Sequence, residues 1–270
     1  MTDEQPPMAE PNLPSPAAPG QPLAAAPEFL PPPPPEPFPF WSYSDLGLFI
    51  GLALVYMLAG PTLVKAVMLV FHWHPSTKLA ELLPAQLLMY SLLFGSLALM
   101  FRLLYGRPFW RSLGWTPMRL PLPLVVGSGI GTLFAVMLLA VLIRVPNESN
   151  PMTELLQNRM SILLIGLFGV TLGPLSEELA FRGFLQPLLV RSLGPVPGVL
   201  LTALIFGLLH FQEYGNSWKH VVIIATAGAC FGWMRQATGS TKAATLMHAT
   251  YNGVQFVALL ALGGKGVPPS

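Results

Sequence analysis

Three charged side chains lie close together in a part of the chain that otherwise carries almost no charge. Glu177, Glu178 and Arg182 fall within six positions, and most residues around them are apolar. On a helix, Glu178 and Arg182 share a face because they are four positions apart, whereas Glu177 points about 100° away. One carboxylate can therefore be held by the arginine while the other addresses a different face, and spacing alone does not decide which.

Two histidines and an asparagine follow on later apolar segments. His210 ends the apolar run 200–209, and Asn252 follows His248 by one helical turn, on the same face. Glutamate, alone or with a metal ion, can take a proton from water so that the water attacks a carbonyl carbon. Histidine and asparagine donors can then stabilise the oxyanion that forms. These residue types together favour a hydrolytic reaction.

Two other functions remain open from the residues alone. In a non-catalytic membrane scaffold or immunity protein, Glu178 and Arg182 would form a buried ion pair that orders the helices, although this leaves Glu177 without a partner. A proton-coupled transporter would use Glu177 and the histidines as a relay. The chain has no Gly-x-Ser-x-Gly, His-Glu-x-x-His or phosphate-binding loop, so a serine hydrolase, a zincin and an NTPase lack support.

The composition is that of an integral membrane protein. Of the 270 residues, 53% are hydrophobic and 10% charged, whereas soluble domains carry about 25% charged residues. A charged side chain near the bilayer centre costs roughly 3 kcal/mol, so the side chains of the charged cluster should face a cavity or pair with one another. The basic excess in residues 41–270 indicates contact with anionic membrane lipids and not with nucleic acid.

Apolar segments punctuated by Gly and Pro predict an all-α, polytopic transmembrane bundle of about eight helical segments. Residues 1–40 contain fifteen prolines and no Lys or Arg, so we expect a disordered, proline-rich, acidic tail. Residues 41–159 should hold the N-terminal transmembrane helices and residues 160–264 a second helix bundle. The expected helices are 45–70, 82–104, 122–143, 160–172, 174–193, 196–211, 218–235 and 243–262.

The flanking residues suggest how the spans are oriented and packed. A loop with four arginines (Arg102, Arg107, Arg111 and Arg119) should be cytoplasmic, which places the N-terminus in the cytoplasm too. Trp41 and Tyr43 are expected to anchor the first span at the membrane interface. Three glycine pairs have the small-residue spacing of close helix contacts: Gly47/Gly51, Gly127/Gly131 and Gly228/Gly232.

Three motifs, in this order on successive membrane helices, resemble one protein family. Glu177-Glu178-x-x-x-Arg182, Phe206-x-x-x-His210 and His248-x-x-x-Asn252 are similar to the motifs of the CPBP family. These are the CAAX-protease and bacteriocin-processing (Abi) intramembrane proteases, related to the eukaryotic endopeptidase that trims prenylated CAAX proteins. The resemblance covers roughly residues 160–262.

The resemblance implies an endopeptidase, of the metallo- or glutamate type, for peptide or lipidated protein substrates in a membrane. It implies that Glu177 and His210 activate the hydrolytic water. His248 and Asn252 would bind the oxyanion or help to hold a metal, while Glu178 and Arg182 would shape the site. Zinc is a candidate cofactor, with Glu177, His210 and His248 as its tentative ligands. A bacterial plasma membrane is the expected location.

Overall fold

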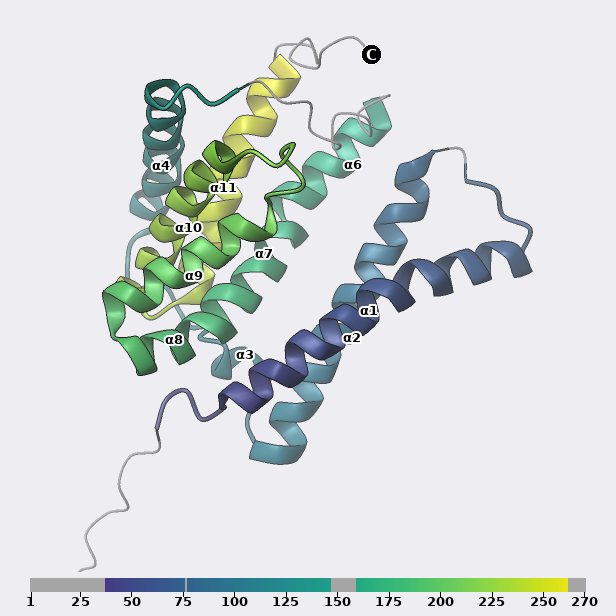
Figure 1. Cartoon of the computed structure of the whole chain (residues 1–270), viewed down its shortest axis with the longest axis horizontal. Coiled ribbons are helices and arrows are strands. Elements are labelled where there is room, and N and C mark those ends of the chain that lie inside the picture. Colours follow the sequence, from purple (N-terminus) through teal and green to yellow (C-terminus); the bar gives the residue numbers. More distant parts are fainter. Residues whose placement is uncertain (1–36, 76, 147–158, 262–270) are drawn as a thin grey trace, which may run out of the picture. The chain divides into compact units, whose positions relative to one another are not determined.

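The computed structural model describes residues 37–75, 77–146 and 159–261, and all regular structure in these ranges is helical. The expected all-α polytopic bundle is confirmed. The elements are α1 (Tyr43–Val70), α2 (Lys78–Tyr105), α3 (Phe109–Ser112), α4 (Leu122–Leu142), α6 (Arg159–Val170), α7 (Leu172–Glu178), the π-helix η1 (Leu179–Leu185), α8 (Gln186–Leu193), α9 (Pro195–Leu209), α10 (Trp218–Thr238) and α11 (Thr241–Ala261) (Figure 1).

Four helical stretches within the described ranges are long and apolar enough to cross a membrane. They are α1, α2, α4 and the stretch Arg159–Leu193. Large apolar side chains remain outside the protein core along these helices; Leu58 of α1, for example, is 73% exposed. Such surfaces are stable in lipid, where the helix satisfies its own backbone hydrogen bonds. The chain is therefore an integral membrane protein.

Local sequence signals set several helix ends. Before α1, the backbone N–H of Ser42 donates to Asp45 at 2.7 Å. Before α2, the hydroxyl of Thr77 accepts from the N–H of Ala80 at 3.3 Å. Each bond satisfies a backbone donor that the first turn of a helix leaves free. At the other end, α2 and α10 stop at Gly106 and Gly239, whose φ angles of 65° and 68° are left-handed.

The stretch Arg159–Leu193 is one apolar segment of membrane length, in which the single turn residue Thr171 separates α6 from α7. The sequence predicted a break between 160–172 and 174–193, at Gly173-Pro174. In the structure only Thr171 interrupts the helix, and Pro174 lies in the first turn of α7. Proline is tolerated there because the missing N–H has no helical acceptor anyway. The residues that carry the charged motif are thus part of a membrane-length element.

The helices of the C-terminal half pack around α10 and α11. α10 contacts α9, α11 and α4, and α11 contacts α4, α6 and α7 (Figure 1). Backbones approach closely where glycine faces a neighbour: a methyl group on Gly129 of α4 would lie 2.6 Å from the carbonyl oxygen of Met247 in α11. This close approach joins α4 to α11, the helix that carries His248 and Asn252, and α11 in turn contacts α7, which ends with Glu178.

The glycine pairs predicted to make close helix contacts behave differently from one another. Gly228 and Gly232 of α10 do meet neighbouring helices, and a methyl group on either would lie within 3.2 Å of another side chain. A methyl group on any of Gly47, Gly51, Gly127 and Gly131 would have no described atom within 4 Å beyond its own helix. Spacing shows that two glycines share a helix face, but it does not show which face meets a neighbour.

Trp41 is buried in the protein and does not anchor α1 at a membrane surface. It is 0% exposed and forms an apolar cluster with residues of α2, the loop after α3, η1 and α8: Leu97, Phe101, Leu113, Leu179, Phe184 and Leu188. The described end of the predicted proline-rich tail, residues 37–40, also packs here through Phe40. Residues 1–36 of that tail lie outside the described part of the chain.

Candidate active site

Glu178 is the carboxylate that pairs with Arg182. Glu178 is the last residue of α7 and Arg182 lies in η1; both side chains are 0% exposed. Arg182 donates one N–H to Glu178 Oε1 at 2.7 Å and another to the carbonyl oxygen of Gly228 in α10 at 2.6 Å. The arginine thereby joins the glutamate helix to α10. Glu178, and not Glu177, is thus the carboxylate that Arg182 holds.

His248 of α11 faces both glutamates. Its Nδ1 lies 2.9 Å from Glu178 Oε1, and its Nε2 lies 3.8 Å from Glu177 Oε2. Because a carboxylate only accepts hydrogen bonds, Nδ1 carries the proton of the shorter contact. The longer distance exceeds a hydrogen bond. His248 is therefore fixed by Glu178, while its other nitrogen is directed toward Glu177.

Aromatic rings surround this charged cluster. Phe231 of α10 stacks on His248, with ring centroids 4.4 Å apart and planes at 18°. The guanidinium carbon of Arg182 lies 4.8 Å from the ring centre of Phe206 and 5.6 Å from that of Phe231. Such rings attract the cation and keep water away, which strengthens the electrostatic interactions inside the cluster.

Glu177 is the more accessible of the two glutamates. Its side chain is 30% exposed, whereas that of Glu178 is fully buried. Glu177 interacts electrostatically with His248, His210, Glu178 and Arg182. The structure therefore gathers both histidines, both glutamates and the arginine of the sequence motifs around one position.

His210 and Asn252 are each bound to backbone. His210 directly follows α9, and its Nδ1 lies 2.8 Å from the carbonyl oxygen of Phe206, whose ring is 4.7 Å from the imidazole. Asn252 of α11 donates to the carbonyl oxygen of Gly169 in α6 at 2.8 Å. That bond uses one of the two amide N–H groups of Asn252 and ties α11 to α6.

The tentative zinc ligands do not form a metal-holding group as they lie. Across residues 37–75, 77–146 and 159–261, no group of three His, Cys, Asp or Glu side chains is close enough to hold an ion. Zinc in proteins takes at least three such ligands at about 2.0–2.3 Å. Glu177, His210 and His248 therefore do not fit a preformed zinc site in this conformation, and a zinc requirement stays a prediction.

Two residues that sequence reasoning missed border the cluster. Phe231 stacks on His248. Tyr90 of α2 interacts electrostatically with Glu177, and its ring lies nearly parallel to that of Phe168 in α6, with centroids 6.2 Å apart. No local pattern marks these positions, because each lies in a generic apolar run.

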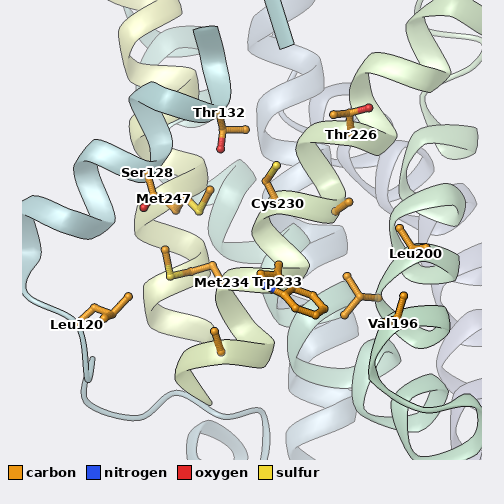
Figure 2. A pocket seen from close by; sticks show the side chains of 13 residues that line it. Leu120, Ser128, Thr132, Val196, Leu200, Thr226, Cys230, Trp233, Met234 and Met247 are labelled. Atoms are coloured by element: carbon orange, nitrogen blue, oxygen red, sulfur yellow. The ribbon is translucent and has the colours of Figure 1, made fainter. Parts of the chain in front are cut away.

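A separate pocket of about 510 Å³ lies between α4, α9 and α10 (Figure 2). Its walls are mostly apolar, with Thr226, Cys230 and Trp233 from α10. At 100° per residue, these side chains lie on the opposite side of α10 from Gly228 and Phe231. None of the six candidate site residues lines this pocket, so it is distinct from the candidate active site.

Together these features define a polytopic membrane protein with an enclosed cluster of ionisable side chains in its C-terminal helices. Residues 159–254 match the family model described as type II CAAX prenyl endopeptidase Rce1-like. This match supports the resemblance to the CAAX-type intramembrane proteases, and the matched segment contains all six candidate site residues. Comparisons with curated proteins and with solved structures found no match.

The contact of Gly228 with the cluster leads to a first prediction. A methyl group there would lie 3.1 Å from Phe206 Cδ1 and 3.2 Å from Arg182 Nη2. Gly→Ala inside a helix normally stabilises by about 1 kcal/mol, but we expect Gly228→Ala to lower the melting temperature and to impair any activity of the cluster. Thermal unfolding in detergent measures the first effect. Gly127→Ala, where the methyl group meets nothing within 4 Å, is the control and should be neutral or stabilising.

Proposed function

We propose that this protein is an intramembrane endopeptidase that hydrolyses peptide bonds in membrane-associated substrates through water activated by Glu177. The substrates are prenylated CAAX-type proteins or other hydrophobic C-terminal segments. The observation that carries the proposal is the different situation of the two glutamates. Arg182 holds the buried Glu178, whereas Glu177 is 30% exposed and lies beside His248. Glu177 is thus the carboxylate able to meet water and substrate.

In the proposed reaction, Glu177 takes a proton from water, assisted by His210, as the water oxygen bonds to the substrate carbonyl carbon. The carbonyl becomes an oxyanion, which Nε2–H of a doubly protonated His248 stabilises while Nδ1–H stays bound to Glu178. Asn252 supplies a second donor through the N–H that Gly169 does not use. The C–N bond then breaks, and the proton on Glu177 passes to the leaving amine.

A non-catalytic scaffold is the second candidate, because the Glu178–Arg182–His248 network also ties three helices together. The two candidates differ in what they require of His210. The contacts of His210 to Phe206 lie at the end of α9, so a scaffold should tolerate the loss of His210. A protease should lose activity without it.

His210→Ala is therefore expected to reduce cleavage by about 100-fold or more, the usual contribution of general acid–base assistance. The measurement is cleavage of a quenched, prenylated CAAX-type peptide by the full chain in detergent. His74→Ala, which removes an exposed histidine from the loop between α1 and α2, controls for loss of an imidazole. Equal activity of the two variants would contradict the assigned role of His210.

The same assay with a zinc chelator tests the cofactor separately. Activity that is lost on chelation and restored by zinc would establish a zinc enzyme. Glu177, His210 and His248 would then be the first residues to mutate in a test of zinc binding. Unchanged activity would leave Glu177 to activate water unaided. We further propose a bacterial plasma membrane with the N-terminus in the cytoplasm, supported by the arginine-rich segment around α3. Reporter fusions at the N-terminus test this orientation.

A further inference from the structure

Residues 37–42, here called the N-terminal strap, bind directly to the π-helix η1. The indole N–H of Trp41 donates to the carbonyl oxygen of Phe184 at 3.1 Å. The two rings also stack, with centroids 5.4 Å apart and planes at 21°. Trp41 and Phe184 are both 0% exposed, so this hydrogen bond is made in a fully enclosed apolar environment, where losing it is costly.

Further bonds keep the strap in place. Arg191 at the end of α8 donates to the carbonyl oxygen of Pro39 at 2.5 Å. Tyr43, the first residue after the strap, donates to Ser192 at 2.7 Å. Asp45 accepts both the N–H of Ser42 and the hydroxyl of Tyr105, each at 2.7 Å. The position of Trp41 is therefore set independently of the active-site residues.

The element that Trp41 contacts is the one that carries Arg182. Phe184 lies two residues after Arg182 in η1, and Arg182 reaches across to α10 on another side. π-helical turns are rare and are often found at functional sites. A π-helical turn needs support from the residues around it, because the same residues would otherwise form the more common α-helix. In this protein the support comes from Trp41 and from α10.

We infer that Trp41 is a positioning residue for the candidate active site. Its N–H fixes the backbone of η1 at Phe184 and thereby holds Arg182, and through it Glu178, in the arrangement that orients His248. The residue lies outside the segment 159–254 that matches the protease family, so the N-terminal part of the chain completes the site. This inference rests on the proposed function.

Trp41→Phe tests the inference because it keeps a buried aromatic ring while it removes the indole N–H, together with part of the buried ring volume. We expect kcat for the quenched CAAX-type peptide to fall about tenfold, the effect of one buried hydrogen bond, while KM changes less than about twofold because Trp41 does not touch substrate. Trp110→Phe, at a tryptophan of α3 that is 49% exposed, should leave both constants unchanged.

Hydrogen exchange of the backbone provides a readout that does not depend on cleavage. In Trp41→Phe, the amides of residues 179–185 should exchange faster, while those of α4 should be unaffected. An unchanged kcat in an active enzyme, or a loss equal to that of Trp110→Phe, would overturn the inference. If the wild-type protein cleaves no peptide, the proposed protease function fails. If the amides of η1 then also exchange at the same rate in the wild-type protein and in Trp41→Phe, the role of the strap is overturned as well.

Discussion

Glu177→Gln is expected to abolish peptide cleavage while leaving the protein folded. Glutamine has nearly the same shape but cannot take a proton from water, so we expect a loss of about 1,000-fold, within the range for a general base. Folding should be spared for a structural reason: Glu177 is partly exposed, and the buried pairing with Arg182 belongs to Glu178. The measurement is the cleavage rate of the quenched CAAX-type peptide, together with the melting temperature in detergent.

Glu81→Gln is a closely matched control for this variant. Glu81 lies in α2, pairs with Lys65 at 3.1 Å, and has a side chain 32% exposed, against 30% for Glu177. It should retain full activity. Wild-type cleavage by Glu177→Gln would exclude the proposed mechanism, and a similar loss in both variants would point to a general effect of removing a carboxylate from this protein.

Arg182→Met is expected to cost about 3–5 kcal/mol of stability, the usual effect of removing one partner of a buried ion pair. Glu178 would remain fully buried, with His248 as its one described hydrogen-bond partner. The same change also removes the bond to the Gly228 carbonyl. Unfolding of the purified protein by denaturant in detergent measures the change. Lys65→Met, which breaks an exposed pair, should cost less than about 1 kcal/mol.

The double variant Glu178→Gln/Arg182→Met separates stability from function. Within the described residues, Glu178 Oε2 and Arg182 Nε have no hydrogen-bond partner, so burial of this pair is only partly compensated. Replacing both charges by neutral groups should therefore recover much of the stability that Arg182→Met loses. Activity should stay low, because His248 loses the carboxylate that orients it. Recovery of activity along with stability would show that the ion pair serves the fold alone.

The sequence was sufficient to predict the class of fold, because hydropathy and helix length are local properties. The expected helices 122–143 and 218–235 agree within a few residues with α4 and α10. The expected start of α2 was four residues late, since Thr77 caps the helix ahead of Pro84. The short helix α3 and the π-helix η1 were missed, because neither has a periodic pattern long enough to recognise.

The sequence also selected the residues of the candidate site. Spacing of four positions identified Glu178 and Arg182 as a possible pair, and the geometry agrees. Spacing could not show which glutamate is buried and which is accessible, because this depends on contacts between helices distant in sequence, such as that of His248 with Glu178, 70 positions earlier. Their catalytic roles remain predictions that the proposed variants test.

Only the tertiary structure placed Trp41 inside the protein. Next to the first apolar span, an aromatic residue looks like an interface anchor, and the sequence predicted one. In the fold it donates to Phe184, 143 positions later, and the rings of Phe206 and Phe231 enclose Arg182 in the same way, from helices distant in sequence. Hydropathy and spacing show on which side of its own helix a residue lies. They do not show which other helix faces that side, because this depends on how all the helices pack. Helix packing therefore determined which glutamate is buried and which residues support η1.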